Sequence, residues 1–91
     1  MPVFQSVSEI KSFIKNQNIN TLRVYLSDDM SKDPIYLGSY LANFPENTLY
    51  LEEYDTLKMT LYKSTFQGKT LDPSPFTITN SSLKQYIFTT S

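Results

Sequence analysis

Apolar residues recur at three- and four-residue intervals near the start of the chain. The stripe consists of Val7, Ile10, Phe13 and Ile14. Ser6 lies just before the stripe and Glu9 lies within it, and their spacing is that of a capping box. In this motif the Ser6 hydroxyl accepts from the Glu9 amide, and the Glu9 carboxylate accepts from the Ser6 amide. This pattern predicts an amphipathic helix of about three turns that ends in the polar run 16–18.

Beyond residue 20 the period changes to strict alternation, which is typical of half-buried strands. Alternating runs over 21–27, 48–54 and 57–62 predict three strands. Residues 35–42 fit both a strand and a helix stripe, but Gly38 weakens a helix, so we predict a strand there. Residues 76–79 and 83–90 predict a C-terminal hairpin across 80–82, with a helix over 83–90 as the alternative.

Two segments rich in turn formers predict loops. Residues 28–34 combine charges with turn formers and show no apolar period. Asp72-Pro73-Ser74-Pro75 contains two prolines, which would remove hydrogen-bond donors from a central strand.

These elements predict an α+β fold in which the N-terminal helix packs on one face of a mostly antiparallel sheet of about four to six strands. The 91 residues have room for one hydrophobic core, and no linker-like stretch divides them. We therefore expect residues 1–91 to form a single domain.

Residue types sort by their parity within the predicted strands, and neighbouring side chains of a strand point to opposite faces. One parity carries Leu22, Val24, Leu26, Ile35, Leu37, Leu41, Leu49, Leu51, Leu57, Met59 and Leu61, and the other carries Tyr25, Tyr36, Tyr40, Tyr50, Tyr54 and Tyr62. The aliphatic face needs the helix as its cover, so we expect the tyrosine face to be turned away from the helix.

Tyrosine has a large rigid ring and a hydroxyl that tolerates water, which suits a binding surface. The candidate binding residues are Arg23, Tyr25, Tyr36, Tyr40, Tyr50, Tyr54, Lys58 and Tyr62. The structural alternative is that cross-strand tyrosine pairs only stabilise a solvated sheet face. The hypothesis we favour is a small non-enzymatic binding module that docks this face on a protein partner or on a second copy of itself, such as a regulator or inhibitor from a phage or mobile element.

The alternative function is binding of single-stranded nucleic acid. In that case Tyr25, Tyr50 or Tyr62 would stack on bases, and the backbone would be followed by Arg23, Lys58, Lys63 and Lys69. The formal net charge of −1 argues against it, and Arg23 is the only arginine. With no apolar run long enough for a signal peptide or a membrane span, we expect a cytoplasmic protein and no membrane association.

The chain has no cysteine and no histidine, which excludes disulfides, Cys-His and Ser-His-Asp catalysis, and histidine-ligated metals. Gly68-Lys69-Thr70 matches the end of a phosphate-binding loop, but Lys63 occupies the position of its first glycine. Met1-Pro2 resembles the start of the tautomerase family, which implies a terminal proline base if Met1 is removed. We rank that enzyme third and expect no catalytic residue, no metal site and no cofactor.

Overall fold

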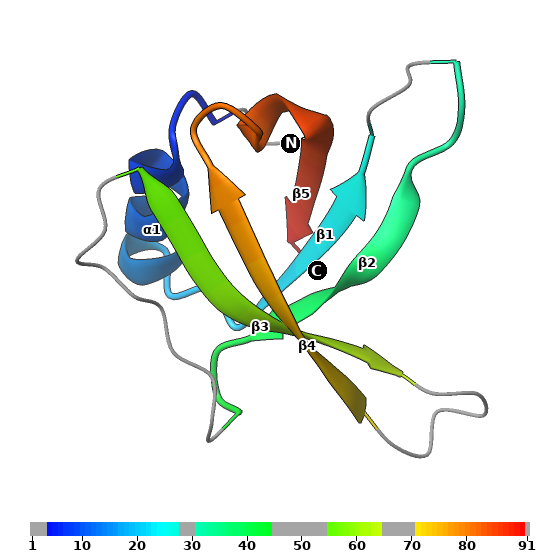
Figure 1. Cartoon of the computed structure of the whole chain (residues 1–91). Coiled ribbons are helices and arrows are strands. Elements are labelled where there is room, and N and C mark those ends of the chain that lie inside the picture. Colours follow the sequence, from blue (N-terminus) through cyan, green and yellow to red (C-terminus); the bar gives the residue numbers. More distant parts are fainter. Residues whose placement is uncertain (1–3, 28–30, 45–54, 65–70, 91) are drawn as a thin grey trace.

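A computed structural model describes residues 4–27, 31–44, 55–64 and 71–90 (Figure 1). In chain order the elements are α1 (Val7–Asn16), β1 (Thr21–Leu26), β2 (Ile35–Leu41), β3 (Thr56–Ser64), β4 (Leu71–Thr79), a 3-10 turn η2 (Leu83–Gln85) and β5 (Tyr86–Thr90). The strands form a five-stranded sheet in the order β4-β3-β2-β1-β5, and every pair of neighbours is antiparallel. The predicted α+β class with an N-terminal helix is confirmed.

Helix α1 begins as its sequence predicts. The Ser6 side chain accepts from the Glu9 amide at 3.4 Å, and the helix ends at Asn16, with the Gln17 amide donating to the Phe13 carbonyl. One detail of the capping box is wrong: the Glu9 carboxylate accepts from the Gln5 amide at 2.6 Å. Glu9 is therefore bonded both to the cap residue Ser6 and to Gln5, which precedes the cap, and these bonds hold the start of the helix.

The hydrophobic core lies between α1 and one face of the sheet. Its buried members are Val7, Ile10, Ile14, Leu22, Val24, Tyr40, Leu57, Met59, Leu61, Ile78, Leu83 and Phe88. The helix covers only part of the sheet, and Figure 1 shows β3 and β4 running in a clearly different direction from β1 and β2. This strong twist bends the sheet around the core.

Strand β2 confirms the preferred reading of residues 35–42, but it contains an irregularity that alternation alone does not predict. Val24 pairs with Gly38, whereas the next residue, Tyr25, pairs with Tyr36, so Leu37 is an extra residue in a β-bulge. Gly38 has φ 148°, a conformation that side chains rarely adopt. The bulge changes the parity of the strand at this point.

Because of the bulge, the predicted faces of two β2 residues are wrong. Tyr40 pairs with Leu22 and is buried in the core, and Leu41 pairs with Thr21 on the opposite face. Ile35, also predicted to lie among the core aliphatics, is 60% exposed at the start of the strand.

Strand β4 contradicts the loop predicted for residues 72–75, because both prolines lie within a strand at the edge of the sheet. The Asn80 amide donates to the Asp55 carbonyl at 3.1 Å, which fixes the phase of the β3–β4 ladder. Counting back in steps of two, Ser74 directs its amide toward β3, and Pro73 and Pro75 occupy positions whose amides would point away from it. The prolines therefore remove no ladder bond.

The C-terminal segment pairs differently from the predicted hairpin. Residues 83–85 form the 3-10 turn, and β5 pairs with β1, at the opposite edge of the sheet from β4. The predicted strand 48–54, the residues Pro2 and Lys69, and most of the aspartates of the 28–34 loop lie outside the described residues. In the part of the chain that is described, we find no helix long and apolar enough to cross a membrane.

Candidate functional site

The face of the sheet turned away from α1, here called the outer face, brings together several of the predicted binding residues. Arg23 pairs with Ser39 and Tyr25 with Tyr36 across β1 and β2, and Ser39 pairs in turn with Tyr62 of β3. Opposed residues of neighbouring strands project to the same face. Arg23, Ser39 and Tyr62 therefore lie in one row across the three strands, and the Tyr25–Tyr36 pair lies beside it on the same face.

Three of these residues surround one hollow on the outer face. Arg23, Tyr25 and Tyr36 line a pocket of about 310 Å³. Arg23 is exposed, and the two tyrosines are half-buried. The pocket thus combines a solvated guanidinium with two aromatic walls.

A contact between the two tyrosines and a hydrogen bond to Ser39 hold the tyrosines of the pocket in place. The Tyr25 and Tyr36 rings lie 5.3 Å apart between centroids and are tilted by 55°. The Tyr36 hydroxyl shares a hydrogen bond of 2.5 Å with the Ser39 hydroxyl, and Ser39 is buried. A side chain fixed at both its ring and its hydroxyl loses little conformational entropy when it binds a ligand.

Tyr62 lies on the predicted face but is not available as a contact surface. Its ring packs against Phe44 at a centroid distance of 4.3 Å, and only 5% of the residue is exposed. Lys58 is exposed on the same strand and pairs with Thr77 of β4, four residues along the chain from Tyr62. On β3, the outer face therefore carries the buried Tyr62 ring, packed against Phe44, and the exposed Lys58.

Of the remaining three candidate residues, only one lies in the part of the chain that the structure describes. Tyr40, predicted to be a binding residue, is instead a core residue, and burial raises the pKa of its hydroxyl above the ordinary value of 10.0. Tyr50 and Tyr54 lie outside the described residues.

Two residues with clear roles were missed by the sequence reasoning. Ser39 positions Tyr36, and Phe44 covers Tyr62. Gly38 was the available signal for Ser39, because glycine is the residue type that tolerates the backbone angle of a bulge. A bulge predicted at Gly38 would have assigned Ser39 to the outer face. No comparable sequence signal existed for Phe44, which follows β2 in a turn.

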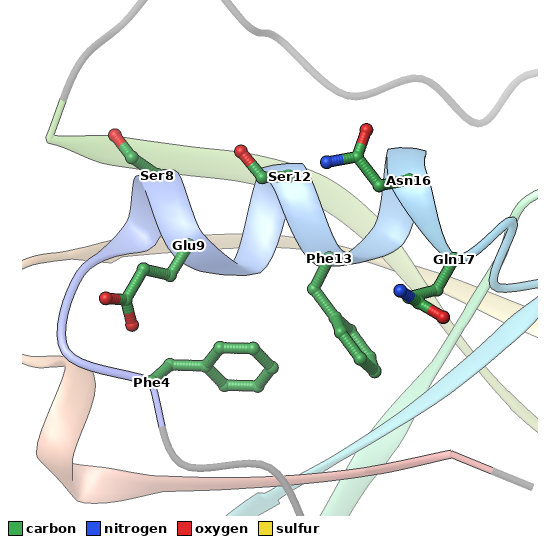
Figure 2. A pocket seen from close by; sticks show the side chains of 7 residues that line it. All are labelled: Phe4, Ser8, Glu9, Ser12, Phe13, Asn16 and Gln17. Carbon is green, nitrogen blue, oxygen red and sulfur yellow. The ribbon is translucent and has the colours of Figure 1, made fainter.

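A second hollow, of about 430 Å³, runs along α1 (Figure 2). Figure 2 shows the Phe4 and Phe13 rings on one side of the helix and Ser8, Ser12 and Asn16 along the other. The Phe4 ring packs edge-on against Phe13 at 5.4 Å and against the core residue Phe88 at 5.9 Å, so it joins this groove to the core. None of the described residues that line it was predicted as a binding residue, and Glu9 is the one charged side chain among them.

The described residues contain no cluster of three or more acidic side chains that could hold a metal ion. Comparisons with protein-family models, with curated proteins and with solved structures find nothing that matches this chain. The geometry of the outer face is therefore the basis for a functional proposal.

Proposed function

We propose that this protein is a small docking module that binds a protein partner through the outer-face pocket formed by Arg23, Tyr25 and Tyr36. The observation that carries the proposal is the gathering of these three predicted residues around one hollow. Arginine and tyrosine, together with tryptophan, are enriched among the residues that dominate protein–protein binding energy.

The supporting features are the restrained geometry and the size of the pocket. The Ser39 hydrogen bond and the ring contact with Tyr25 hold Tyr36 in one position before any partner arrives. A hollow of about 310 Å³ matches the lower end of the range that binding pockets occupy, which suits one or two side chains of a partner.

Site-specific photo-crosslinking in the native host tests the proposal. The photo-reactive residue p-benzoylphenylalanine replaces Tyr25 in one sample and the exposed helix residue Ser12 in a control sample. We expect a discrete crosslinked protein from position 25 and not from position 12. An excess of unlabelled wild-type protein should abolish the crosslink.

Two competitor variants separate the pocket from the rest of the outer face. Unlabelled Tyr36→Ala should fail to compete, whereas Thr77→Ala, an exposed β4 residue on the same face, should compete as wild type does. Circular dichroism confirms that both competitors are folded. Equal competition by the two variants would refute docking at this pocket, and a crosslink to a second copy of the chain would replace the separate partner with a homodimer.

A single-stranded nucleic acid is the alternative occupant. If nucleic acid is the occupant, a fluorescent oligonucleotide should bind at low salt, and its affinity should fall steeply as the salt concentration rises, because phosphate contacts release counterions. The protein-docking proposal expects no such binding.

A further inference from the structure

We infer that the outer-face pocket takes a carboxylate, so that the partner presents an acidic side chain to Arg23. This inference rests on the proposed docking function and names the chemistry of the partner at that site. It follows from the way charge is distributed over the two faces of the sheet.

At the described strand positions, the charged side chains of the outer face are positive, although the chain carries a formal net charge of −1. Cross-strand pairing places Arg23 and Lys58 there, and they are the only charged side chains at outer-face positions of the described strands. Arg23 is flanked by Ser39 on one side and by Thr89 of β5 on the other, and neither carries a charge.

The described acidic residues all lie elsewhere. Glu9 is in α1, Asp33 and Asp55 precede β2 and β3, and Asp72 pairs with Lys63 at the end of the β3–β4 ladder, on the parity of the core. No described strand residue therefore offers a carboxylate to Arg23 on its own face. The guanidinium has five N–H donors in a planar fork that matches the two oxygens of a carboxylate.

The pocket walls explain why a peptide side chain is favoured over a free anion. Tyr25 and Tyr36 are half-buried and supply apolar ring surface beside the guanidinium. Residues that flank an aspartate or glutamate in an extended segment would contact these rings while the carboxylate pairs with Arg23. Nucleic-acid affinity depends on contacts to several phosphates, whereas Arg23 is the one charged residue among the described residues that line the pocket.

The single arginine allows a direct test by nuclear magnetic resonance. Because Arg23 is the only arginine, a uniformly ¹⁵N-labelled sample gives one arginine Nε–Hε signal. The probes are a capped five-residue peptide with a central glutamate between valines, and its twin with glutamine in place of the glutamate. We expect the glutamate peptide to shift the Arg23 Nε–Hε signal and to bind about tenfold more tightly than the glutamine twin.

Variants at Arg23 give the matched controls. In Arg23→Gln the affinity ratio of the two peptides should fall to about one, and in Arg23→Lys it should take an intermediate value, because lysine keeps the charge but loses the fork. The backbone amide signals of distant β4 residues such as Thr77 should remain unchanged throughout.

The outcomes separate the inference from the proposed function. Equal shifts of the Tyr25 and Tyr36 amides by both peptides would overturn the carboxylate while leaving a docking pocket in place. Absence of any shift with the glutamate peptide would also overturn it, whatever photo-crosslinking shows. If a twelve-nucleotide oligothymidine shifts the Arg23 signal at lower concentration than the glutamate peptide does, the site binds nucleic acid and the inference of a carboxylate ligand is rejected.

Discussion

The Val7 amide donates to the side-chain oxygen of Asn80 at 2.9 Å, which ties the first turn of α1 to the turn that follows β4. The first amides of a helix have no partner within the helix, so this contact satisfies a donor that would otherwise be lost beside the buried Val7 side chain. Through its own amide, Asn80 also donates to Asp55 just before β3. One residue thus joins the helix to the hairpin formed by β3 and β4.

Replacing Asn80 should therefore weaken the whole domain. We expect Asn80→Ala to lower the free energy of unfolding by about 1 kcal/mol, the usual cost of removing a helix cap. Asn80→Asp keeps an acceptor and adds a negative charge near the helix N-terminus, so it should match or exceed wild type. Urea denaturation measures both, and equal losses in the two variants would contradict a capping role.

A side chain at Gly38 should be costly. A Cβ atom there would lie 3.0 Å from the Leu61 Cβ, and φ 148° is strained for any other residue type. We expect Gly38→Ala to lower the free energy of unfolding by about 1–3 kcal/mol. Thr77→Ala, at an exposed strand position, should stay within about 0.5 kcal/mol of wild type in the same assay, and a similarly small effect at Gly38 would show that the bulge is not required.

Tyr40 should make stability fall at high pH. Burial raises the pKa of its hydroxyl, so the folded state holds the proton more tightly than the unfolded state does. Its contribution is complete below the unfolded pKa of about 10 and is lost as pH rises through the folded value. Urea midpoints between about pH 9 and about pH 11.5 should fall less in Tyr40→Phe than in wild type. Parallel slopes for the two proteins would rule out this linkage.

The phase of the β4 ladder gives a test by proline placement. Ser74→Pro removes an amide directed at Leu61 of β3, so it should cost about 1–3 kcal/mol by leaving a carbonyl without its donor. Pro75→Thr, at the neighbouring outward position, should change stability by no more than about 0.5 kcal/mol. Thermal unfolding compares the pair, and a larger effect at position 75 would invert the assigned phase.

Local signals in the sequence were sufficient for α1, β1 and β3. The Ser6 cap and the apolar stripe predict the helix, and alternation places Arg23 and Tyr25 on one face and Leu57 and Met59 on the other, as observed. These elements follow the regular helix and strand periods, so residue spacing alone determines their faces.

Nonlocal or irregular features were not accessible in the same way. The β2 bulge moves Tyr40 into the core, and the prolines of β4 are tolerated only because that strand lies at an edge. The pairing of β5 with β1 joins segments about sixty residues apart, which no turn motif indicates. Within the candidate site, Arg23, Tyr25 and Tyr36 could be predicted by parity, but the burial of Tyr62 depends on Phe44 from the turn that follows β2.

The extra residue in β2 divides the strand into two parts whose side-chain alternation is shifted by one residue. Before the bulge Tyr36 lies on the outer face, and after it Tyr40 lies in the core, although regular alternation would have put both phenols on the same face. A substitution at position 36 therefore changes the outer face, while the ring in the core belongs to another residue of the same strand. One extra amino acid thus lets seven residues of chain supply a phenol to the surface and another to the interior.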